Sequence, residues 1–295
     1  MPTPAQTPFA DRLAAAIDRT GSIACVGLDP VLEKLPPACT TGCDAPSAIH
    51  SFCDGILQAV VGLVPVVKFQ SACFERYGPP GLAALNASIS HARSLGLITI
   101  LDAKRGDIGI SAEHYAHAAF VTAQADALTV NPYLGMETLE PYLAVGGPAR
   151  GLFVLVRTSN PGSDALQSLA LTDGRTVGEA VGGMVAAVGR KSLGANGLSS
   201  VGAVVGATKA ADATRLRAAM PDQVFLVPGY GAQGGQAEDV RPMLRTGKTP
   251  SSRALLVTAS RSVIYPIGEA RSPVWTENVR TAADNLNREI AQILN

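Results

Sequence analysis

Eight short apolar segments recur along this chain of 295 residues, and segments with helical periodicity separate them. The apolar segments show little polar alternation, which is typical of strands buried on both faces of a parallel sheet. The expected strands are Ile23–Leu28, Val64–Phe69, Leu97–Leu101, Ala127–Val130, Leu152–Val156, Val201–Val205, Val224–Val227 and Ala254–Val257. This alternation constrains the fold most, because each strand–helix pair adds one parallel strand to a sheet.

The intervening segments predict helices. They are Ser47–Val61, Gly81–Leu95, Ser111–Ala123, Gly178–Val188, Ala211–Met220, Gln236–Arg245 and, at the end of the chain, Thr276–Leu294. Eight strands alternating with helices favour a closed (β/α)8 TIM barrel over an open doubly wound sheet, and such barrels of about 250 residues commonly form one domain. No linker divides the chain, so we expect a single α/β domain over residues 1–295.

Charge and composition argue against several classes of function. Lys and Arg together number 24, as do Asp and Glu, so no basic surface for nucleic acid or anionic lipid is indicated. No apolar stretch reaches the ~18 residues that cross a bilayer, and the first residues lack the features of a signal peptide. The five cysteines have no zinc-type spacing, so we expect free thiols in a cytoplasmic protein.

A charged segment follows the third expected strand. It reads Asp102-Ala103-Lys104-Arg105-Gly106-Asp107-Ile108, directly after Leu97–Leu101. Because side chains alternate along a strand, Asp102 and Lys104 are expected on the same side, with Asp107 on the following loop. Burying carboxylates and an amine together seldom serves stability alone. The segment therefore predicts a preorganised charged site.

Polar residues also follow other expected strands. Asp29 follows the first strand, Lys68 ends the second, Asn131 ends the fourth, and Arg157-Thr158-Ser159 follows the fifth. The active sites of α/β barrels lie at the carboxyl ends of the strands, so these positions predict a site at that mouth of the barrel. Taken alone, Lys68 also fits a lysine whose stem packs at the barrel end, and Asp29 a turn residue.

A glycine-rich segment follows the seventh strand. It reads Pro228-Gly229-Tyr230-Gly231-Ala232-Gln233-Gly234-Gly235 and leads into an expected helix. Glycines let the backbone approach an anion, and a helix N-terminus presents N–H groups to it. Arg261 follows the eighth strand, and barrels frequently bind phosphate between the loops after strands 7 and 8. We therefore expect Arg261 and the N–H groups of Gly234 and Gly235 to hold a phosphate.

The charged segment after the third strand also resembles a known signature. Together with Ser111, it is similar to the Asp-x-Lys-x-x-Asp-Ile-x-x-Thr motif of the orotidine 5′-phosphate decarboxylase family. The resemblance extends in order to Gly27-Leu28-Asp29-Pro30, Val67-Lys68-Phe69-Gln70, the glycine-rich segment and Ser260-Arg261-Ser262. The segment Lys68–Glu75 and the chain length look like the longer bacterial branch of the family, type 2.

The resemblance implies a lyase without cofactor or metal. Such an enzyme converts orotidine 5′-monophosphate to uridine 5′-monophosphate and CO2, the last step of de novo UMP synthesis. The Lys-Asp-Lys-Asp tetrad of the family falls on Lys68, Asp102, Lys104 and Asp107. Loss of CO2 leaves a carbanion at C6. An ammonium fixed by carboxylates can stabilise and protonate that carbanion, so Lys104 is the expected acid.

The resemblance also implies a homodimer and a set of substrate contacts. The family pattern places Asp107 in the partner subunit's site, together with Ser111, which keeps the hydroxyl of the commoner Thr. Asp29 and Lys68 are expected at the ribose and Ser159 at the pyrimidine edge. The phosphate is expected to bind to Arg261, Gly234 and Gly235, with Gln233 between the phosphate and the pyrimidine base.

Three other functions stay open at this point. A Mg²⁺-dependent sugar-phosphate lyase or aldolase uses a similar framework but needs a further carboxylate, for which Glu75 is the candidate. A Schiff-base aldolase would use Lys104 or Lys68 as its nucleophile, although nearby carboxylates keep a lysine protonated. The third is a nucleotide-binding barrel without activity, and the complete tetrad argues against it.

Overall fold

The computed structural model describes residues 7–231, 234–266 and 272–294. Its strands form a closed barrel in which each strand pairs in parallel with the next and β8 pairs with β1. The strands are β1 Ala24–Leu28, β2 Val66–Gln70, β3 Ile98–Arg105, β4 Ala127–Val130, β5 Gly151–Arg157, β6 Ser199–Val205, β7 Gln223–Val227 and β8 Leu255–Ala259. The predicted α/β barrel is confirmed, and each predicted strand overlaps an observed one.

The strands are apolar because both of their faces are covered. One face lines the barrel interior and the other packs against helices, so every residue of β1, β6, β7 and β8 is buried. Strand β3 is longer than predicted, since it runs beyond Leu101 to Arg105. This extension carries the charged residues to the mouth of the barrel.

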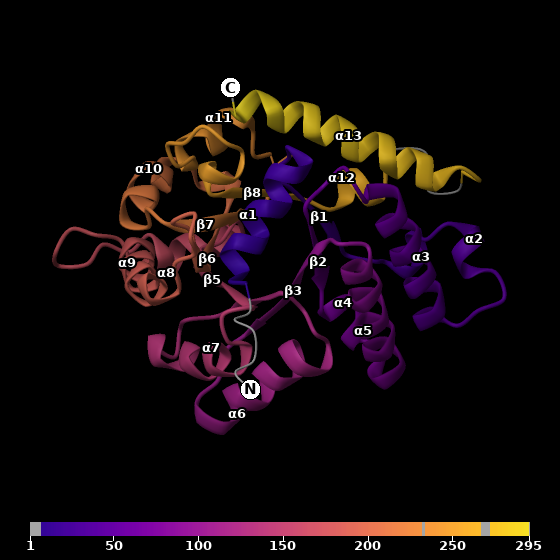
Figure 1. Cartoon of the computed structure of the whole chain (residues 1–295), viewed down its shortest axis with the longest axis horizontal. Helices are drawn as coiled ribbons and strands as arrows, with labels where there is room; N and C mark the ends of the chain where they lie inside the picture. The colour runs from indigo at the N-terminus through magenta and orange to yellow at the C-terminus, as the bar shows by residue number, and fades with distance from the viewer. Residues whose placement is uncertain (1–6, 232–233, 267–271, 295) are drawn as a thin grey trace.

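Helices follow the strands and surround the barrel (Figure 1). They are α1 Phe9–Thr20, α2 Pro37–Thr40, α3 Ala45–Val60, α4 Ala72–Glu75, α5 Gly78–Ser94, α6 Gly109–His117, α7 Glu140–Gly146, α8 Asp164–Gln167, α9 Val177–Gly189, α10 Ala210–Ala219, α11 Ala237–Val240, α12 Arg261–Ile264 and α13 Trp275–Leu294. The predicted helix Gln236–Arg245 is shorter in the structure, because a 3₁₀ turn follows Val240. The predicted helices do not include α1 or α7.

Helix α1 covers the N-terminal end of the barrel, and it crosses in front of the strands in Figure 1. Phe9 packs edge-on against Phe153 of β5, with ring centroids 6.3 Å apart. Gly151 is needed beneath it, since a Cβ there would lie 2.2 Å from the Phe9 ring. The Ala10 N–H donates to Ser200 Oγ at 3.2 Å. The carboxyl end of the barrel is therefore the end left for a site.

Arg217 of α10 ties together the starts of two neighbouring strands. Its buried guanidinium donates to four backbone carbonyl oxygens at 2.7–3.0 Å, those of Met220, Gln223, Met243 and Ala254. The guanidinium also lies over the Phe225 ring, 3.6 Å from its centroid. Burial lowers the pKa of Arg217 below its usual range. The side chain acts as a hydrogen-bonded clamp on β7 and β8.

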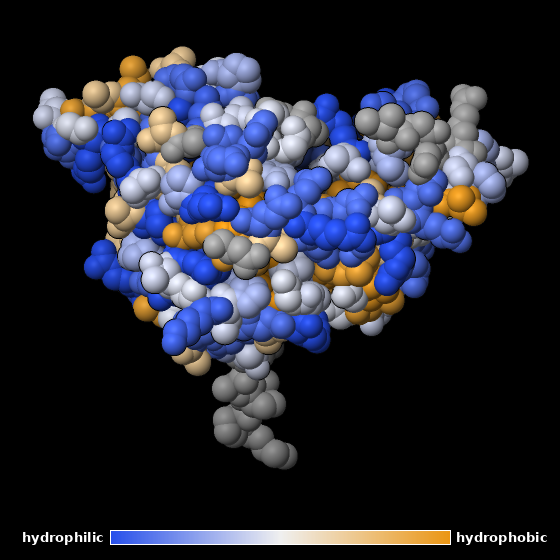
Figure 2. All heavy atoms as spheres, turned by 90° about the horizontal axis from the view of Figure 1, so that it is seen from above, coloured by the Kyte–Doolittle hydropathy of each residue, from blue (hydrophilic) through white to orange (hydrophobic). Residues whose placement is uncertain are grey.

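Among the described residues, no helix is both long and apolar enough to cross a bilayer. Figure 2 shows a face on which hydrophilic residues predominate and hydrophobic residues form separate groups. All five cysteines are free, as predicted, and Cys25, Cys39 and Cys53 are buried.

Candidate active site

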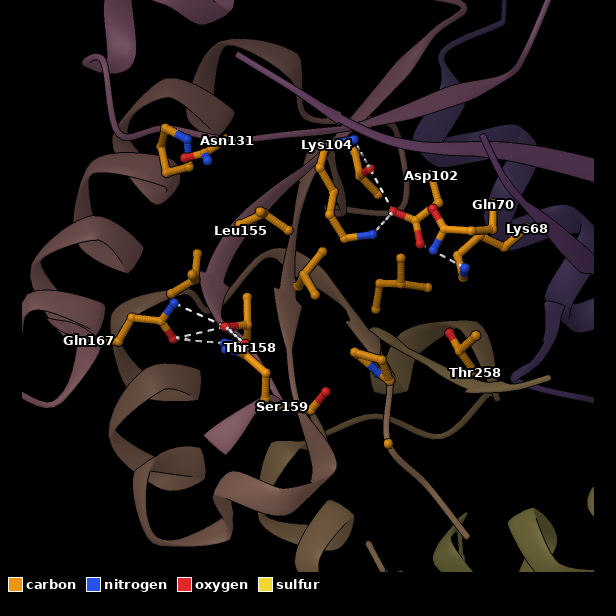
Figure 3. A pocket seen from close by; sticks show the side chains of 18 of the residues that line it. Lys68, Gln70, Asp102, Lys104, Asn131, Leu155, Thr158, Ser159, Gln167 and Thr258 are labelled. Carbon is orange, nitrogen blue, oxygen red and sulfur yellow. Dashed lines mark hydrogen bonds and ion pairs between the residues drawn. The ribbon is translucent and has the colours of Figure 1, made fainter. Parts of the chain in front are cut away.

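A cavity of about 830 Å³ opens at the carboxyl end of the barrel. Its lining includes six of the predicted site residues: Asp29, Lys68, Asp102, Lys104, Ser159 and Arg261. Figure 3 shows Lys68, Asp102 and Lys104 on one side of this cavity, with Thr158 and Ser159 on another. The ends of the parallel strands thus bring residues from distant parts of the sequence into one site.

Asp102 lies between two lysines (Figure 3). Its Oδ2 accepts a hydrogen bond from Lys68 Nζ and its Oδ1 one from Lys104 Nζ, each at 2.7 Å. Lys68 and Asp102 are buried, whereas the Lys104 side chain is 47% exposed. The buried Lys68–Asp102 pair therefore holds the Lys104 ammonium in position, and this ammonium is exposed enough to contact a bound molecule.

Mutual attraction keeps this buried pair charged. Burial alone would raise the pKa of Asp102, but Lys68 and Lys104 outweigh burial and hold that pKa well below its usual range. Burial alone would lower the pKa of Lys68, but Asp102 and Asp29 outweigh it and raise that pKa above its usual range. A lysine held as an ammonium is not a nucleophile, which argues against a Schiff base at Lys68.

The charge pairing predicts how stability depends on pH. The lowered Asp102 pKa stabilises the fold above the unfolded value of about 3.9, and this contribution is lost as the pH falls through the folded value. The raised Lys68 pKa stabilises the fold below the unfolded value of about 10.4, and this contribution is lost as the pH rises through the folded value.

The difference in unfolding free energy between wild type and Asp102→Asn should therefore stay constant from about pH 5 to about pH 7 and shrink below about pH 4. Urea unfolding at each pH measures this difference, because the titration of other carboxylates cancels in the comparison. A difference that changes between about pH 5 and about pH 7 would show that Asp102 titrates there, which contradicts a permanently ionised carboxylate.

Lys104 has an unusual backbone conformation. Its φ is +48°, in the left-handed region that costs a non-glycine residue about 1–2 kcal/mol. The pairing of β3 with β4 shifts here, because Leu101 pairs with Leu128 but Arg105 pairs with Val130. Asp102 and Lys104 do line one cavity. A bulge, and not the regular alternation that the sequence suggested, brings them there.

Asp29 lies beside the lysine pair. Its Oδ1 is 3.8 Å from Lys68 Nζ, and this buried oxygen accepts no hydrogen bond from the described residues. Across the cavity, the Thr158 N–H donates to Gln167 Oε1 at 2.8 Å, and Gln167 Nε2 donates to Thr158 Oγ1 at 3.0 Å (Figure 3). These bonds fix the loop that carries Ser159.

Asp107 and Ser111 do not line the cavity of their own chain. Asp107 Oδ1 accepts a hydrogen bond from the Ile108 N–H at 2.8 Å, just before α6 begins. Ser111 is exposed on the first turn of α6. One chain alone therefore brings together three members of the predicted tetrad and leaves the fourth outside.

The glycine-rich loop uses its N–H groups internally in this structure. The Gly234 N–H donates to the Gly231 carbonyl at 2.9 Å, and the Gly235 N–H donates to the Gly229 carbonyl at 3.1 Å. Binding of a phosphate by these two groups, as predicted, requires the loop to exchange those bonds. Gln233 lies outside the described residues.

Several cavity residues were not in the predicted set. Among them are Gln70, Thr129 and Thr258, and also Asn131, which was expected at the mouth of the barrel but was given no role in the site. The strand-end position of Asn131 was a usable signal, whereas Thr129 and Thr258 look in the sequence like ordinary β-branched strand residues.

Glu75, the candidate extra carboxylate of a Mg²⁺-dependent lyase, is not in the cavity lining. Its Oε1 accepts a hydrogen bond from Ser71 Oγ at 2.6 Å and pairs with Arg105. The contacts with Ser71 and Arg105 hold the Glu75 carboxylate outside the site.

The sequence matches known proteins over most of its length. Residues 25–267 match the family model described as "Orotidine 5'-phosphate decarboxylase / HUMPS family". The chain belongs to this family. An orotidine 5′-phosphate decarboxylase of Rhodopirellula baltica is 44% identical over 96% of this chain and 98% of that relative. Another, from Clostridium acetobutylicum, is 36% identical over 96% of this chain and 99% of that relative.

Solved structures agree with this membership of the decarboxylase family. The OMP decarboxylase of Leishmania donovani superposes with a TM-score of 0.79 at 32% identity, covering 97% of this chain and 98% of that one. The orotidine 5′-monophosphate decarboxylase of Methanocaldococcus jannaschii, solved with the inhibitor BMP, gives a TM-score of 0.61 at 16% identity, covering 92% of this chain and 98% of that one. The second comparison supports the fold alone.

Proposed function

We propose that the chain catalyses the reaction of its family through Lys104, Asp102 and Lys68, with Asp107 supplied by a second subunit. The chain is a carboxy-lyase that converts orotidine 5′-monophosphate to uridine 5′-monophosphate and CO2 in de novo pyrimidine synthesis. The observation that carries the proposed mechanism is the charged row in the cavity, in which one carboxylate holds two ammonium groups at 2.7 Å.

This row suits a reaction that develops localised negative charge. Breaking the bond between C6 and the substrate carboxylate releases CO2 and leaves the electron pair on C6. Lys104 Nζ, fixed by Asp102 and half exposed to the cavity, stabilises this charge and then donates a proton to C6. The resulting neutral amine takes up a proton from solvent, which restores the ammonium for the next turnover.

Asp102 acts on the bound substrate before CO2 leaves. For Lys104 to reach C6, the substrate carboxylate must lie close to the buried Asp102 carboxylate. Two neighbouring carboxylates repel each other, and the repulsion disappears as the substrate carboxylate becomes neutral CO2. Lys68 holds Asp102 in place during this change.

Other residues around the cavity bind the remaining groups of the substrate. We assign Asp29 and Lys68 to the ribose hydroxyls, Ser159 to the pyrimidine edge and Arg261 to the phosphate, and the fact that all four line the cavity supports this assignment. Binding energy from a remote phosphate can order loops and orient the reacting carbon. Gly234, Gly235 and Gln233 complete the proposed phosphate site once the glycine-rich loop has rearranged.

A homodimer is part of this proposal. Asp107 and Ser111 lie on the loop after β3 and the start of α6, outside their own cavity. Large apolar side chains are exposed on the loop after β3, on the first turn of α6 and on the loop after β4: Ile108, Ile110, Tyr133 and Leu134. Exposed apolar groups of this kind mark interaction surfaces, and a second copy docked here would receive Asp107 in its cavity. The cytoplasmic location stays a prediction from the sequence.

The activity is tested by following the ultraviolet absorbance of orotidine 5′-monophosphate with purified protein in excess EDTA. We expect the substrate to be consumed at the same rate with and without EDTA, and one CO2 to be released for each uridine 5′-monophosphate formed. No reaction with this nucleotide, together with Mg²⁺-dependent cleavage of a sugar phosphate, would instead support the metal-dependent lyase.

Mixing inactive variants tests the shared site. If Asp107 acts in the partner's cavity, a mixture of Asp107→Ala and Lys104→Ala subunits contains heterodimers with one intact site. Random exchange then restores about one quarter of wild-type activity. A mixture of Lys68→Ala and Lys104→Ala is the matched control, because both lysines belong to the same cavity and no intact site can form. Equal recovery in both mixtures, or none in the first, would contradict the shared site.

A further inference from the structure

Thr129 of β4 lies at the centre of the charged row without being part of the predicted tetrad. It lines the cavity and is 1% exposed. Its Oγ1 donates to Asp102 Oδ1 at 2.8 Å and accepts from the Lys104 backbone N–H at 2.9 Å. The same Asp102 oxygen accepts from Lys104 Nζ. One hydroxyl therefore connects Asp102 to the backbone of the residue that reaches into the cavity.

The direction of these two bonds is fixed by chemistry. A hydroxyl has a single proton, an ionised carboxylate can only accept, and a backbone N–H can only donate. The Thr129 proton must therefore point at Asp102, while its lone pair receives the Lys104 N–H. Thr129 is a third donor to Asp102 beside the two lysines, and hydrogen bonds to an ionised group are the stronger kind.

The second bond stabilises the bulge in β3. The Lys104 N–H donates to the Thr129 side chain where the register between β3 and β4 is interrupted. Lys104 is left-handed at this point, a conformation that persists only when its surroundings hold it. The bond to Thr129 is a contact that holds it, and the bulge directs the Lys104 side chain into the cavity.

We propose that Thr129 is a positioning residue of the decarboxylation. Its hydroxyl keeps Asp102 ionised and oriented, and it stabilises the backbone that aims Lys104 at the reacting carbon. Thr129 acts through these two residues and not on the scissile bond. The inference rests on the proposed function, in which Asp102 and Lys104 act on the substrate.

The variants Thr129→Val and Thr129→Ser separate the hydroxyl from the methyl group. In Thr129→Val we expect kcat to fall by about 10- to 100-fold, the effect of losing one hydrogen bond to a charged group. Affinity for uridine 5′-monophosphate should stay within about threefold, because the product lacks the carboxylate that faces Asp102. Thr129→Ser should keep kcat within about threefold of wild type, because the hydroxyl remains.

Thr99 provides a matched control at the opposite end of the barrel. Its Oγ1 donates to Asp126 Oδ2 at 2.9 Å and accepts from the Asp126 N–H at 3.0 Å, so it makes the same pair of bonds to a buried carboxylate and a backbone N–H. Thr99→Val should lower the melting temperature and leave kcat unchanged. Equal losses of kcat in Thr99→Val and Thr129→Val would assign both effects to general destabilisation and overturn the proposal.

The proposal is also overturned if Thr129→Val keeps kcat within about twofold, or if the Val and Ser variants lose kcat equally. If Thr129→Val does not fold, Thr129→Ala replaces it, and equal kcat in the Ala and Ser variants likewise overturns the proposal. A readout independent of turnover is the Asp102 carboxyl pKa by carbon NMR, which should rise in Thr129→Val. This measurement distinguishes failure of the inference from failure of the proposed reaction.

Discussion

Replacing Lys104 with alanine is expected to lower kcat by at least about 10⁴-fold, because in the proposed mechanism this one group supplies both electrostatic stabilisation and the proton. Uridine 5′-monophosphate should still bind within about tenfold of its wild-type affinity, since the groups proposed for its ribose and phosphate are untouched. Stopped-flow absorbance and product-binding titrations measure the two effects. Lys248→Ala is the matched control. This lysine is exposed and does not line the cavity, so its replacement should leave activity unchanged.

A second variant separates the two roles of Lys104. Lys104→Arg keeps a positive charge, but a guanidinium is a very poor proton donor because its pKa exceeds about 12. We expect this variant to stay severely impaired, with hydrogen–deuterium exchange at C6 of the product reduced alongside decarboxylation. Activity of Lys104→Arg close to wild type would show that another group delivers the proton.

The largest effect on stability is expected from Arg217→Met. Removing the guanidinium leaves four buried carbonyl oxygens without their shared donor, and the unfolding free energy should fall by about 3–5 kcal/mol. Methionine keeps much of the apolar stem, so the change reports mainly on the lost hydrogen bonds. Urea unfolding followed by circular dichroism measures the difference.

Arg288→Met is the control for this measurement. Arg288 lies on α13 with its side chain 71% exposed and pairs with Asp284, so its loss should change the unfolding free energy by about 0.5 kcal/mol or less. An Arg217→Met protein within about 1 kcal/mol of wild type would show that water replaces the guanidinium at the starts of β7 and β8.

The barrel could be predicted because its signal is repeated and local. Each strand is an apolar run such as Val201–Val205, and only a structure with helices on the outside covers both faces of eight such strands. Helix α1 was missed although its segment carries a helical pattern, in which the buried residues Phe9, Leu13 and Ile17 recur at every fourth position. Its segment mixes apolar residues with Asp11, Arg12 and Asp18, and the surface that buries its apolar side is the assembled end of the barrel.

The site could be predicted to the level of residues but not of geometry. Strand-end positions pointed to Lys68, Asp102 and Lys104, and these do meet in one cavity. Nothing local marks the left-handed backbone at Lys104, because no glycine or asparagine stands there. The role of the Thr129 hydroxyl depends on how β4 lies against that bulge, which is a property of two strands and not of either segment.

The pairing of β1 with β8 has a consequence for the order of assembly. Lys68, Asp102 and Lys104 come from the first half of the chain, but Arg261 follows the last strand, which joins β1 through Ala24 and Val257. A growing or refolding chain therefore has no complete nucleotide pocket until its final strand has docked. Recovery of turnover during refolding, measured at protein concentrations at which subunit association is not rate-limiting, would report the moment at which the ring closes, separately from the earlier appearance of helix.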